Sequence, residues 1–491
     1  MQTESQSVPA DQLATLFRQF LAVESVLSRE EERRPYECDG LSVYRQLPLL
    51  VVLPETVEQV QRVLRICSEH KVPVVARGAG TGLSGGALPL ADGVLLSLAK
   101  FNRILGIDLQ NRCARVQPGV RNLAISEAVA AHNLYYAPDP SSQIACSIGG
   151  NVAENAGGVH CLKYGLTVHN ILKLEIVTME GERLTIGSDA LDTPGFDLLA
   201  LLSGSEGMLG VIVEITVKLL PRPEAVQVLL AAFDDVANAG DAVGKIIAAG
   251  IIPAGLEMMD NPAIRAAEAF AQAGYPKDAA AILLCELDGG QQEVVTQVEQ
   301  VKTVLQDCGA TEVRVAASAA EREKFWKGRK AAFPAVGRIS PDYYCMDGTI
   351  PRHQLPKVLA GITALSEEYS LPVANVFHAG DGNLHPLILF DANRPGELER
   401  TEEMGGRILD LCVAAGGTIT GEHGVGVEKI NQMCHQFSSA TLQQMHALKA
   451  AFDPAGLLNP GKAIPTLHRC AEFGAMHVHH GEVPFPELER F

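Results

Sequence analysis

A glycine-rich stretch, PVVARGAGTGLSGGALPLADGVLLSL, most constrains the fold that this chain can adopt. Its Gly80, Gly82 and Gly85 spell G-x-G-x-x-G directly after an apolar run that predicts a strand. This spacing marks a dinucleotide-binding Rossmann turn only when a helix follows the glycines. Here Pro89 stands where the helix interior would be, at a cost of about 3 kcal/mol, and another strand pattern follows. The sequence therefore excludes a Rossmann turn at this loop.

The same loop, residues 77–86, nevertheless suits a phosphate group. Its glycines and small residues expose successive backbone N–H groups and allow a phosphate to approach closely. The alternative is a tight loop at a sheet edge. Two more loops rich in small residues, 137–158 and 203–210, shift the balance. Such loops in one region indicate an extended ligand with a pyrophosphate in its middle.

Length and pattern divide the chain into domains. Its 491 residues suggest two or three domains. Residues 47–221 contain short strand patterns and a capped helix that starts after Thr56, which predicts an α+β region without regular βαβ repeats. From residue 225 to 316, strands alternate with helices, which predicts a second compact domain of helices on an antiparallel sheet.

Charge and cysteine spacing exclude several functions. The net charge of -18 argues against a nucleic-acid surface and against electrostatic binding to anionic lipid. No two cysteines form C-x-x-C, which argues against a zinc ribbon or an iron–sulfur cluster. The first residues lack a basic segment followed by an apolar core, so we expect no signal peptide.

A candidate metal site begins in NVFHAGDGNLHPLIL. Asp381-Gly382 predicts a two-residue hairpin turn, which would place His378 directly opposite His385. Opposed residues have Cβ atoms roughly 4.5–5.5 Å apart, so the two imidazoles could bind one divalent metal. The alternative is a pair of ordinary buried histidines.

The segment GGTITGEHGVGVEK presents Glu422 and His423 between glycines. Two histidines and one carboxylate make a metal site with open positions, so Glu422 is the candidate third ligand. The alternative for this pair is a turn or a helix cap.

These motifs resemble known flavoproteins. The three loops are similar to the FAD-binding module of the vanillyl-alcohol oxidase and p-cresol methylhydroxylase (PCMH) superfamily. FHAGDGNLHP and GEHG resemble the C-terminal half of FAD-dependent D-2-hydroxyacid dehydrogenases, and the likeness extends over about residues 47–465. The implied fold class is α+β: a PCMH-type FAD-binding domain, then a ferredoxin-like α+β substrate or cap domain, then a C-terminal helical segment. The expected boundaries are a helical lead-in at 1–46, the FAD-binding domain at 47–223, the cap domain with the metal site at 224–445, and a C-terminal segment with a tail at 446–491.

The resemblance also implies the residues around the cofactor. We expect FAD without a covalent link, because the first loop lacks the histidine that tethers flavin in some relatives. The cofactor-binding residues implied by the resemblance are Arg77, Gly78, Gly80, Thr81, Gly82, Leu83, Ser84, Gly85, Gly86, Pro138, Asp139, Ser141, Ser142, Ser147, Gly149, Gly150, Asn151, Gly157, Gly158, Gly210, Val211 and Asn459.

For the chemistry, the resemblance assigns the divalent metal, with zinc and manganese as candidates, to His378, His385 and Glu422. It implies that His423 is the catalytic base and that Arg329 binds the carboxylate of the substrate. The alternative for Arg329 is an ordinary arginine on the protein surface. The stretch from residue 326 to 351 is similar to flavoprotein subunits of bacterial glycolate-oxidising complexes.

The implied reaction is oxidation of glycolate, or of D-lactate, to the 2-oxo acid, with the hydride passing to flavin N5. The implied partners are a second flavoprotein subunit and an iron–sulfur subunit, which carry electrons to quinone from a cytoplasmic position or from the inner face of the membrane. Enzymes for the longer D-2-hydroxyglutarate carry a lysine where this chain has Cys345-Met346. The alternatives are a stand-alone D-lactate or D-2-hydroxyglutarate dehydrogenase and a non-catalytic flavin-binding subunit.

Overall fold

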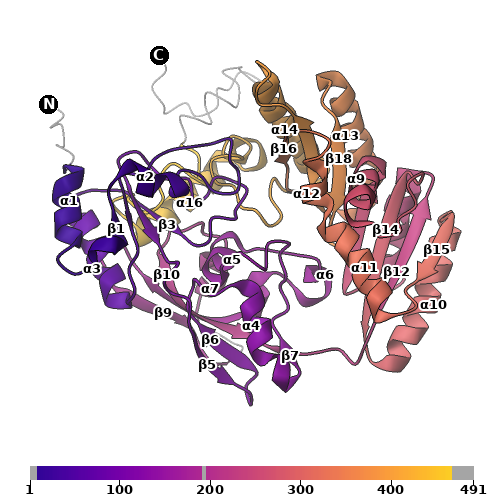
Figure 1. The fold of residues 1–491 in the computed structure, drawn as a ribbon, viewed down its shortest axis with the longest axis horizontal. Coiled ribbons are helices and arrows are strands. Elements are labelled where there is room, and N and C mark those ends of the chain that lie inside the picture. The colour runs from indigo at the N-terminus through magenta and orange to yellow at the C-terminus, as the bar shows by residue number, and fades with distance from the viewer. Residues whose placement is uncertain (1–7, 191–194, 467–491) are drawn as a thin grey trace. The chain divides into compact units, whose positions relative to one another are not determined.

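The computed structural model describes residues 8–190 and 195–466 and divides into two compact units (Figure 1). Unit 1 comprises the described parts of 1–156, 166–221 and 422–491, and unit 2 comprises 157–165 and 222–421. The crossing between residues 221 and 222 lies beside the expected boundary at 223, whereas residues 157–165, expected in the FAD-binding domain, belong to unit 2. The chain rejoins unit 1 at Glu422, well before the expected position at 446. The tail from residue 467 lies outside the described residues.

Unit 1 contains a mixed four-stranded sheet in the order β1-β2-β4-β3 and an antiparallel five-stranded sheet in the order β5-β6-β10-β8-β9. The short strands β11 and β7 pair separately. The strands of unit 1 are β1 (Val26–Leu27), β2 (Leu50–Val52), β3 (Val74–Arg77), β4 (Val94–Ser97), β5 (Ile104–Asp108), β6 (Cys113–Val116), β7 (Leu134–Tyr135), β8 (Ile171–Val177), β9 (Arg183–Gly187), β10 (Val211–Lys218) and β11 (Leu220–Pro221). Its helices are α1 (Ala10–Phe17), α2 (Glu30–Arg33), α3 (Val57–Glu69), α4 (Asn122–Val129), α5 (Ile148–Glu154), α7 (Leu198–Leu202), α15 (Met433–Gln436) and α16 (Ser439–Phe452).

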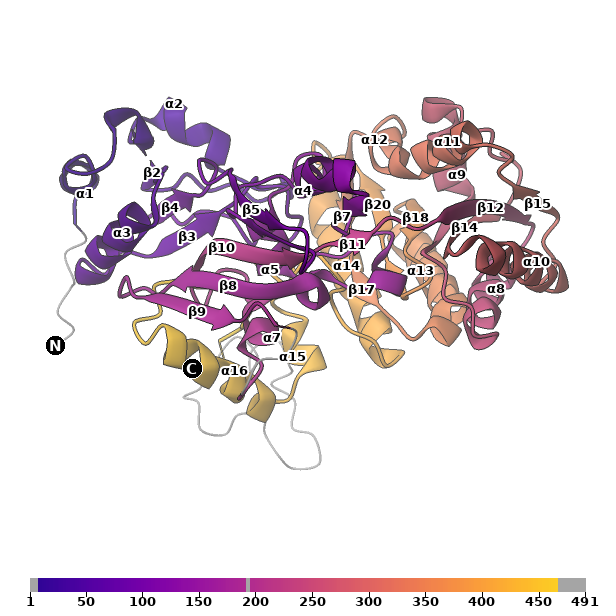
Figure 2. The same ribbon diagram turned by 90° about the horizontal axis from the view of Figure 1, so that it is seen from below.

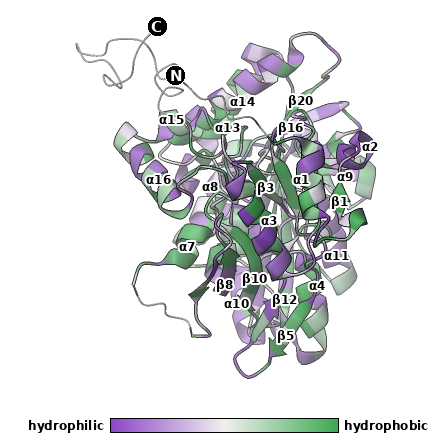
Figure 3. Cartoon of the chain, turned by 90° about the vertical axis from the view of Figure 1, so that its left-hand side faces the viewer, coloured by the Kyte–Doolittle hydropathy of each residue, from purple (hydrophilic) through white to green (hydrophobic). Residues whose placement is uncertain are grey.

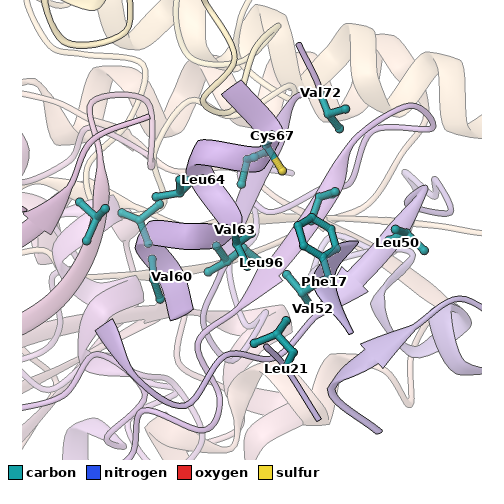
Figure 4. Close-up of a cluster of buried hydrophobic side chains, with 14 of the residues drawn as sticks. Phe17, Leu21, Leu50, Val52, Val60, Val63, Leu64, Cys67, Val72 and Leu96 are labelled. Atoms are coloured by element: carbon teal, nitrogen blue, oxygen red, sulfur yellow. The ribbon is translucent and has the colours of Figure 1, made fainter. Parts of the chain in front are cut away.

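Helix α3 shows how sequence pattern becomes packing in unit 1. The side chain of Thr56 accepts a hydrogen bond from the Gln59 amide, and Oε1 of Gln59 accepts one from the Thr56 amide, which is the predicted capping box. Val60, Val63 and Leu64 face the four-stranded sheet and are buried (Figure 4). Figure 3 shows the apolar character of the neighbouring strand β3. This core anchors the glycine-rich loop that leaves β3.

No helix lies between β3 and β4, as the sequence predicted. The parallel strands β3 and β4 pair side by side, and the chain between them is an irregular loop. Gly80 and Gly85 both have a φ of +73°, a conformation that suits glycine. The exclusion of a Rossmann turn is therefore confirmed.

Unit 2 is built on a seven-stranded sheet in the order β15-β12-β14-β13-β18-β20-β16. Figure 2 shows α9, α11 and α12 on one side of β12 and β14, and α8 and α10 on the other. The strands of unit 2 are β12 (Ala225–Phe233), β13 (Gly255–Asp260), β14 (Ala281–Gly289), β15 (Glu312–Val315), β16 (Asp342–Cys345), β17 (Gly348–Thr349), β18 (Val373–Phe377), β19 (Asn383–Leu384) and β20 (Pro386–Phe390). Its helices are α6 (Cys161–Tyr164), α8 (Val236–Ala248), α9 (Asn261–Ala271), α10 (Gln291–Asp307), α11 (Ala319–Lys330), α12 (Ala332–Val336), α13 (Leu355–Tyr369) and α14 (Glu397–Ala414).

The histidine hairpin has a different register from the predicted one. His378 bridges Asn383, and the Val376 amide bonds to the His385 carbonyl, so His378 does not oppose His385. The loop between the closing residues holds four residues, 379–382, instead of two. Since side chains alternate between faces with a period of two, a shift of two residues leaves both imidazoles on one face. The predicted two-residue turn was wrong, but the predicted proximity of His378 and His385 is confirmed.

Among the described residues, helices long and apolar enough to cross a membrane are absent.

Candidate functional site

In unit 1 the first two glycine-rich loops lie against each other. Ser147 is the N-cap of α5, and its Oγ accepts hydrogen bonds from the amides of Gly150, at 3.4 Å, and Ala79, at 3.3 Å. A Cβ on Gly78 would lie 2.2 Å from the same Oγ, so only glycine allows this approach. Two loops that the sequence treated as parts of one ligand site are thus adjacent. We call residues 77–86 together with 147–151 the glycine cradle.

The glycine cradle offers unused backbone donors. No described residue accepts a hydrogen bond from the amides of residues 80–83. Successive free amides in a glycine-containing turn form a concavity that favours an anion. The donor set therefore fits the pyrophosphate of a dinucleotide.

Arg77 lies beneath this loop. Its Nη1 donates to the Cys38 carbonyl at 2.7 Å, and its Nη2 would lie 2.1 Å from a Cβ on Gly80. Burial lowers the pKa of Arg77, while Asp39 opposes this shift. The guanidinium of Arg77 packs against Gly80 and adds positive charge near the backbone amides of the loop.

Asn122 ties other predicted cofactor residues together. Its Nδ2 donates to the carbonyl of Pro138 and to Oδ1 of Asn151, each at 3.0 Å. Asn122 was not predicted from the sequence, because an asparagine at the start of a helix normally indicates only a cap. The segment that contains Asp139, Ser141 and Ser142 is thereby held beside α5.

The end of the glycine cradle is held by a buried lysine and an asparagine. Nδ2 of Asn459 donates to the carbonyls of Gly86, at 3.0 Å, and Glu206, at 2.6 Å. Nζ of Lys462 donates to the carbonyls of Gly86 and Leu88 and to Oδ1 of Asn459. Three acceptors call for the ammonium form, although burial lowers the pKa of Lys462 to about 7. Asn459 thus fixes the loop through contacts with the protein.

A carboxylate of the third loop holds the segment that follows His423. The two oxygens of Glu206 accept hydrogen bonds from the amides of Val425 and Gly426, both at 2.7 Å. Burial raises the pKa of Glu206, while these amides oppose the shift. Within unit 1, Glu206 therefore fixes the backbone just beyond His423.

The remaining predicted cofactor residues divide between the units. Gly157 and Gly158 fall in unit 2. Gly210 precedes β10 and packs on Ile176, since its Cβ would lie 2.8 Å from that side chain. A packing role explains Gly210 without a ligand.

In unit 2, the two candidate metal-binding histidines are neighbours. The ring centroids of His378 and His385 are 5.0 Å apart with an interplanar angle of 84°, and both side chains are buried. The rings of Phe333 and His385 make an edge-to-face contact, with centroids 6.2 Å apart. Two buried imidazoles at this separation are a donor set that suits a divalent transition metal.

A carboxylate that the sequence reasoning missed connects His378 with Arg329. Glu257 on β13 lies with Oε1 2.7 Å from His378 Nδ1 and with Oε2 2.6 Å from Arg329 Nη2. Burial raises the pKa of Glu257, but His378 and Arg329 outweigh it and the net shift is downward. Arg329 is only 2% exposed, which excludes the surface-arginine alternative.

Asp347 is a second buried carboxylate in unit 2. Its Oδ1 lies 3.5 Å from His385 Nε2. Its Oδ2 accepts hydrogen bonds from the Thr420 hydroxyl, at 2.6 Å, and from the Gly421 amide, at 3.1 Å. Gly421 is the last residue of unit 2, and Glu422 follows it by one peptide bond. Asp347 therefore fixes the chain just before Glu422, as Glu206 fixes it just after His423.

Two of the missed residues had weak signals in the sequence. Glu257 is the charged residue within the apolar run GLEMM, and Lys462 stands in a glycine- and proline-rich segment. A charged residue in an apolar strand indicates a buried pair, but it does not identify the partner.

Comparison with known proteins identifies the family to which the chain belongs. Residues 48–187 match the family model of the FAD binding domain, and residues 222–463 match that of the C-terminal domain of FAD linked oxidases. Glycolate oxidase subunit GlcD of Escherichia coli K12 is 72% identical over 95% of this chain and 93% of that protein. D-lactate dehydrogenase of Anaerostipes hadrus is 32% identical over 90% of this chain and 95% of that protein. The structure of p-cresol methylhydroxylase with bound substrate superposes with a TM-score of 0.78 at 18% identity, covering 93% of this chain and 97% of that one. This last likeness confirms the predicted PCMH-type fold.

Proposed function

Because the chain belongs to the FAD-linked oxidases and is a flavin-dependent oxidoreductase, we propose that it oxidises glycolate to the 2-oxo acid. The observation that carries this proposal is the buried group in unit 2, where His378 and Arg329 contact the carboxylate of Glu257 and the ring of His385 packs against that of His378. The identity of 72% to a glycolate oxidase subunit favours glycolate as the substrate.

The reaction removes the hydroxyl proton and a hydride from the α-carbon of the substrate. FAD in the glycine cradle supplies the hydride acceptor when it is bound. We assign the hydroxyl proton to His423, since imidazole titrates near neutral pH. Arg329 would bind the carboxylate of the substrate, because among the described residues its buried Nε has no hydrogen-bond acceptor.

We propose that His378 and His385 hold a divalent metal and that Glu422 is the third donor. The buried imidazoles fit such an ion, and Glu422 follows directly on the segment that Asp347 fixes. The ion would act as a Lewis acid on the substrate hydroxyl.

A small substrate agrees with the residues near the end of β16. Cys345 and Met346 are both buried, with 3% and 2% of their surfaces exposed. Neither side chain can pair with a second carboxylate, which disfavours D-2-hydroxyglutarate. D-lactate is the second candidate, because a relative at 32% identity is named D-lactate dehydrogenase.

We also propose partner subunits. The E. coli relative is named as a subunit of glycolate oxidase, which favours a complex of several subunits. We propose a second flavoprotein subunit and an iron–sulfur subunit as the partners. In that case electrons would pass to quinone from the inner face of the membrane through those partners.

An anaerobic titration of the purified chain tests the proposal. We expect glycolate to bleach the flavin spectrum at lower concentration than D-lactate and D-2-hydroxyglutarate, in a sample that also contains bound metal. His423→Ala should keep its flavin and lose the bleaching. A yellow protein that none of the three acids bleaches would refute the proposal and support a non-catalytic flavin-binding subunit.

A further inference from the structure

The side chain of Glu257 stands between two groups that the proposed reaction needs. Strands β13 and β18 pair with Met258 opposite Phe377, so the same register places Glu257 opposite His378. Cross-strand neighbours of this kind have Cβ atoms about 4.5–5.5 Å apart. The contact is therefore built into the sheet.

Glu257 constrains the hydrogen on the His378 ring. An ionised carboxylate only accepts hydrogen bonds, so Nδ1 of His378 must carry the hydrogen that lies toward Oε1, 2.7 Å away. In the neutral imidazole this leaves Nε2 as the nitrogen with a lone pair. A metal-binding histidine needs that lone pair, and a carboxylate on the other nitrogen fixes the tautomer and the ring orientation.

The other oxygen of the same carboxylate orients Arg329. Oε2 lies 2.6 Å from Nη2 of Arg329, and both side chains are almost fully buried. Nε is left without a hydrogen-bond acceptor among the described residues, so the guanidinium keeps a donor for another anion. One buried carboxylate thus sets the geometry of both the His378 imidazole and the Arg329 guanidinium.

From this geometry we infer that Glu257 is a positioning residue, which presents His378 Nε2 to a divalent cation and holds Arg329 ready for a substrate carboxylate. The inference rests on the proposed metal site and extends it to a residue on a different strand. Loss of such an outer carboxylate typically weakens metal affinity by about 10–100-fold.

The test uses the full chain with flavin bound, after metal removal by EDTA. The Kd for Zn²⁺ and for Mn²⁺ is measured by competition with a chromophoric chelator, and the flavin content is read from the visible spectrum. We expect Glu257→Gln to retain flavin, to bind both ions at least tenfold more weakly, and to raise the KM for glycolate. A Kd within twofold of wild type would overturn the inference.

The matched control is Asp260→Asn, which removes a buried carboxylate from the same strand but from the opposite face. Asp260 caps α9 and accepts a hydrogen bond from Asn375, so it has its own structural role without contact to the His378 ring. We expect its metal affinity to equal that of wild type. An equal loss in both variants would indicate a general structural effect and would overturn the positioning role.

Two further measurements separate the possible failures. If Glu257→Gln yields no flavin-containing protein, Glu257→Asp keeps the charge on a shorter side chain, and an unchanged Kd there refutes the inference. If wild type binds neither ion and His378→Ala changes nothing, the proposed metal site is wrong, and the inference fails with it. If wild type binds through His378 and Glu257→Gln binds equally well, only the inference fails.

Discussion

Replacing Gly80 with alanine tests whether the glycine cradle has the conformation that FAD binding requires. Gly80 has a φ of +73°, and a Cβ added there would lie 2.1 Å from Nη2 of Arg77. Arg77 cannot move freely, because its Nη1 donates to the Cys38 carbonyl at 2.7 Å. The substitution must therefore strain the backbone and displace the guanidinium.

Two contributions determine how strongly Gly80→Ala destabilises the protein. A left-handed conformation costs an L-residue about 1–2 kcal/mol. Loss of a hydrogen bond to a charged group costs about 1.5–3 kcal/mol. The sum, about 2.5–5 kcal/mol, exceeds the effect of an ordinary surface substitution, which stays within about 0.5 kcal/mol. If the loop relaxes to avoid this strain, its amides lose their arrangement, and we expect the Kd for FAD to rise at least tenfold.

The control is Gly82→Ala in the same loop. The nearest atom to a Cβ there is Oδ2 of Asp39 at 3.9 Å, and Gly82 does not have a positive φ. Urea unfolding of the apoprotein gives the free energy, and titration with FAD gives the Kd from flavin fluorescence. In an Arg77→Met background the Gly80→Ala penalty should fall to the backbone part alone, about 1–2 kcal/mol. Equal penalties for the two glycines would refute the reasoning.

Two further predictions concern buried charges. Lys462→Met should lower the flavin content, and it should lower the free energy of unfolding by at least about 1.5–3 kcal/mol, because it removes the charged donor shared by Gly86, Leu88 and Asn459. Full flavin content and an unchanged urea midpoint would contradict this prediction. Burial raises the pKa of Asp260 from 3.8 to about 6, so the folded state holds this proton more tightly than the unfolded state. The resulting stability is present below pH 3.8 and is lost as the pH rises through 6, by up to about 3 kcal/mol. Asp260→Asn lacks this loss, so its free energy of unfolding should rise relative to that of wild type between pH 4 and pH 7. Parallel curves of unfolding free energy against pH for the two proteins would contradict this prediction.

The fold was predictable where local chemistry decides it. The capping box at Thr56 starts α3, and Pro89 prevents a helix after the glycines. Both effects act within a few residues, so neither depends on distant parts of the chain. The proximity of His378 and His385 was also predictable, because the alternation of strand faces tolerates a register error of two residues.

By itself, the sequence determined the class of ligand loops, the fold class and the set of candidate imidazoles. Only the tertiary structure decided which buried charges meet. Glu257 reaches His378 across 121 positions of sequence, and Lys462 reaches Gly86 across 376. Such pairs depend on the order of strands in the sheet and on the return of the chain to an earlier sheet. Local patterns of hydrophobicity predict neither of these features. The physical reason is that a buried charge must have a partner nearby in space. The sequence indicates that such a partner is needed, but it does not identify the residue that supplies it.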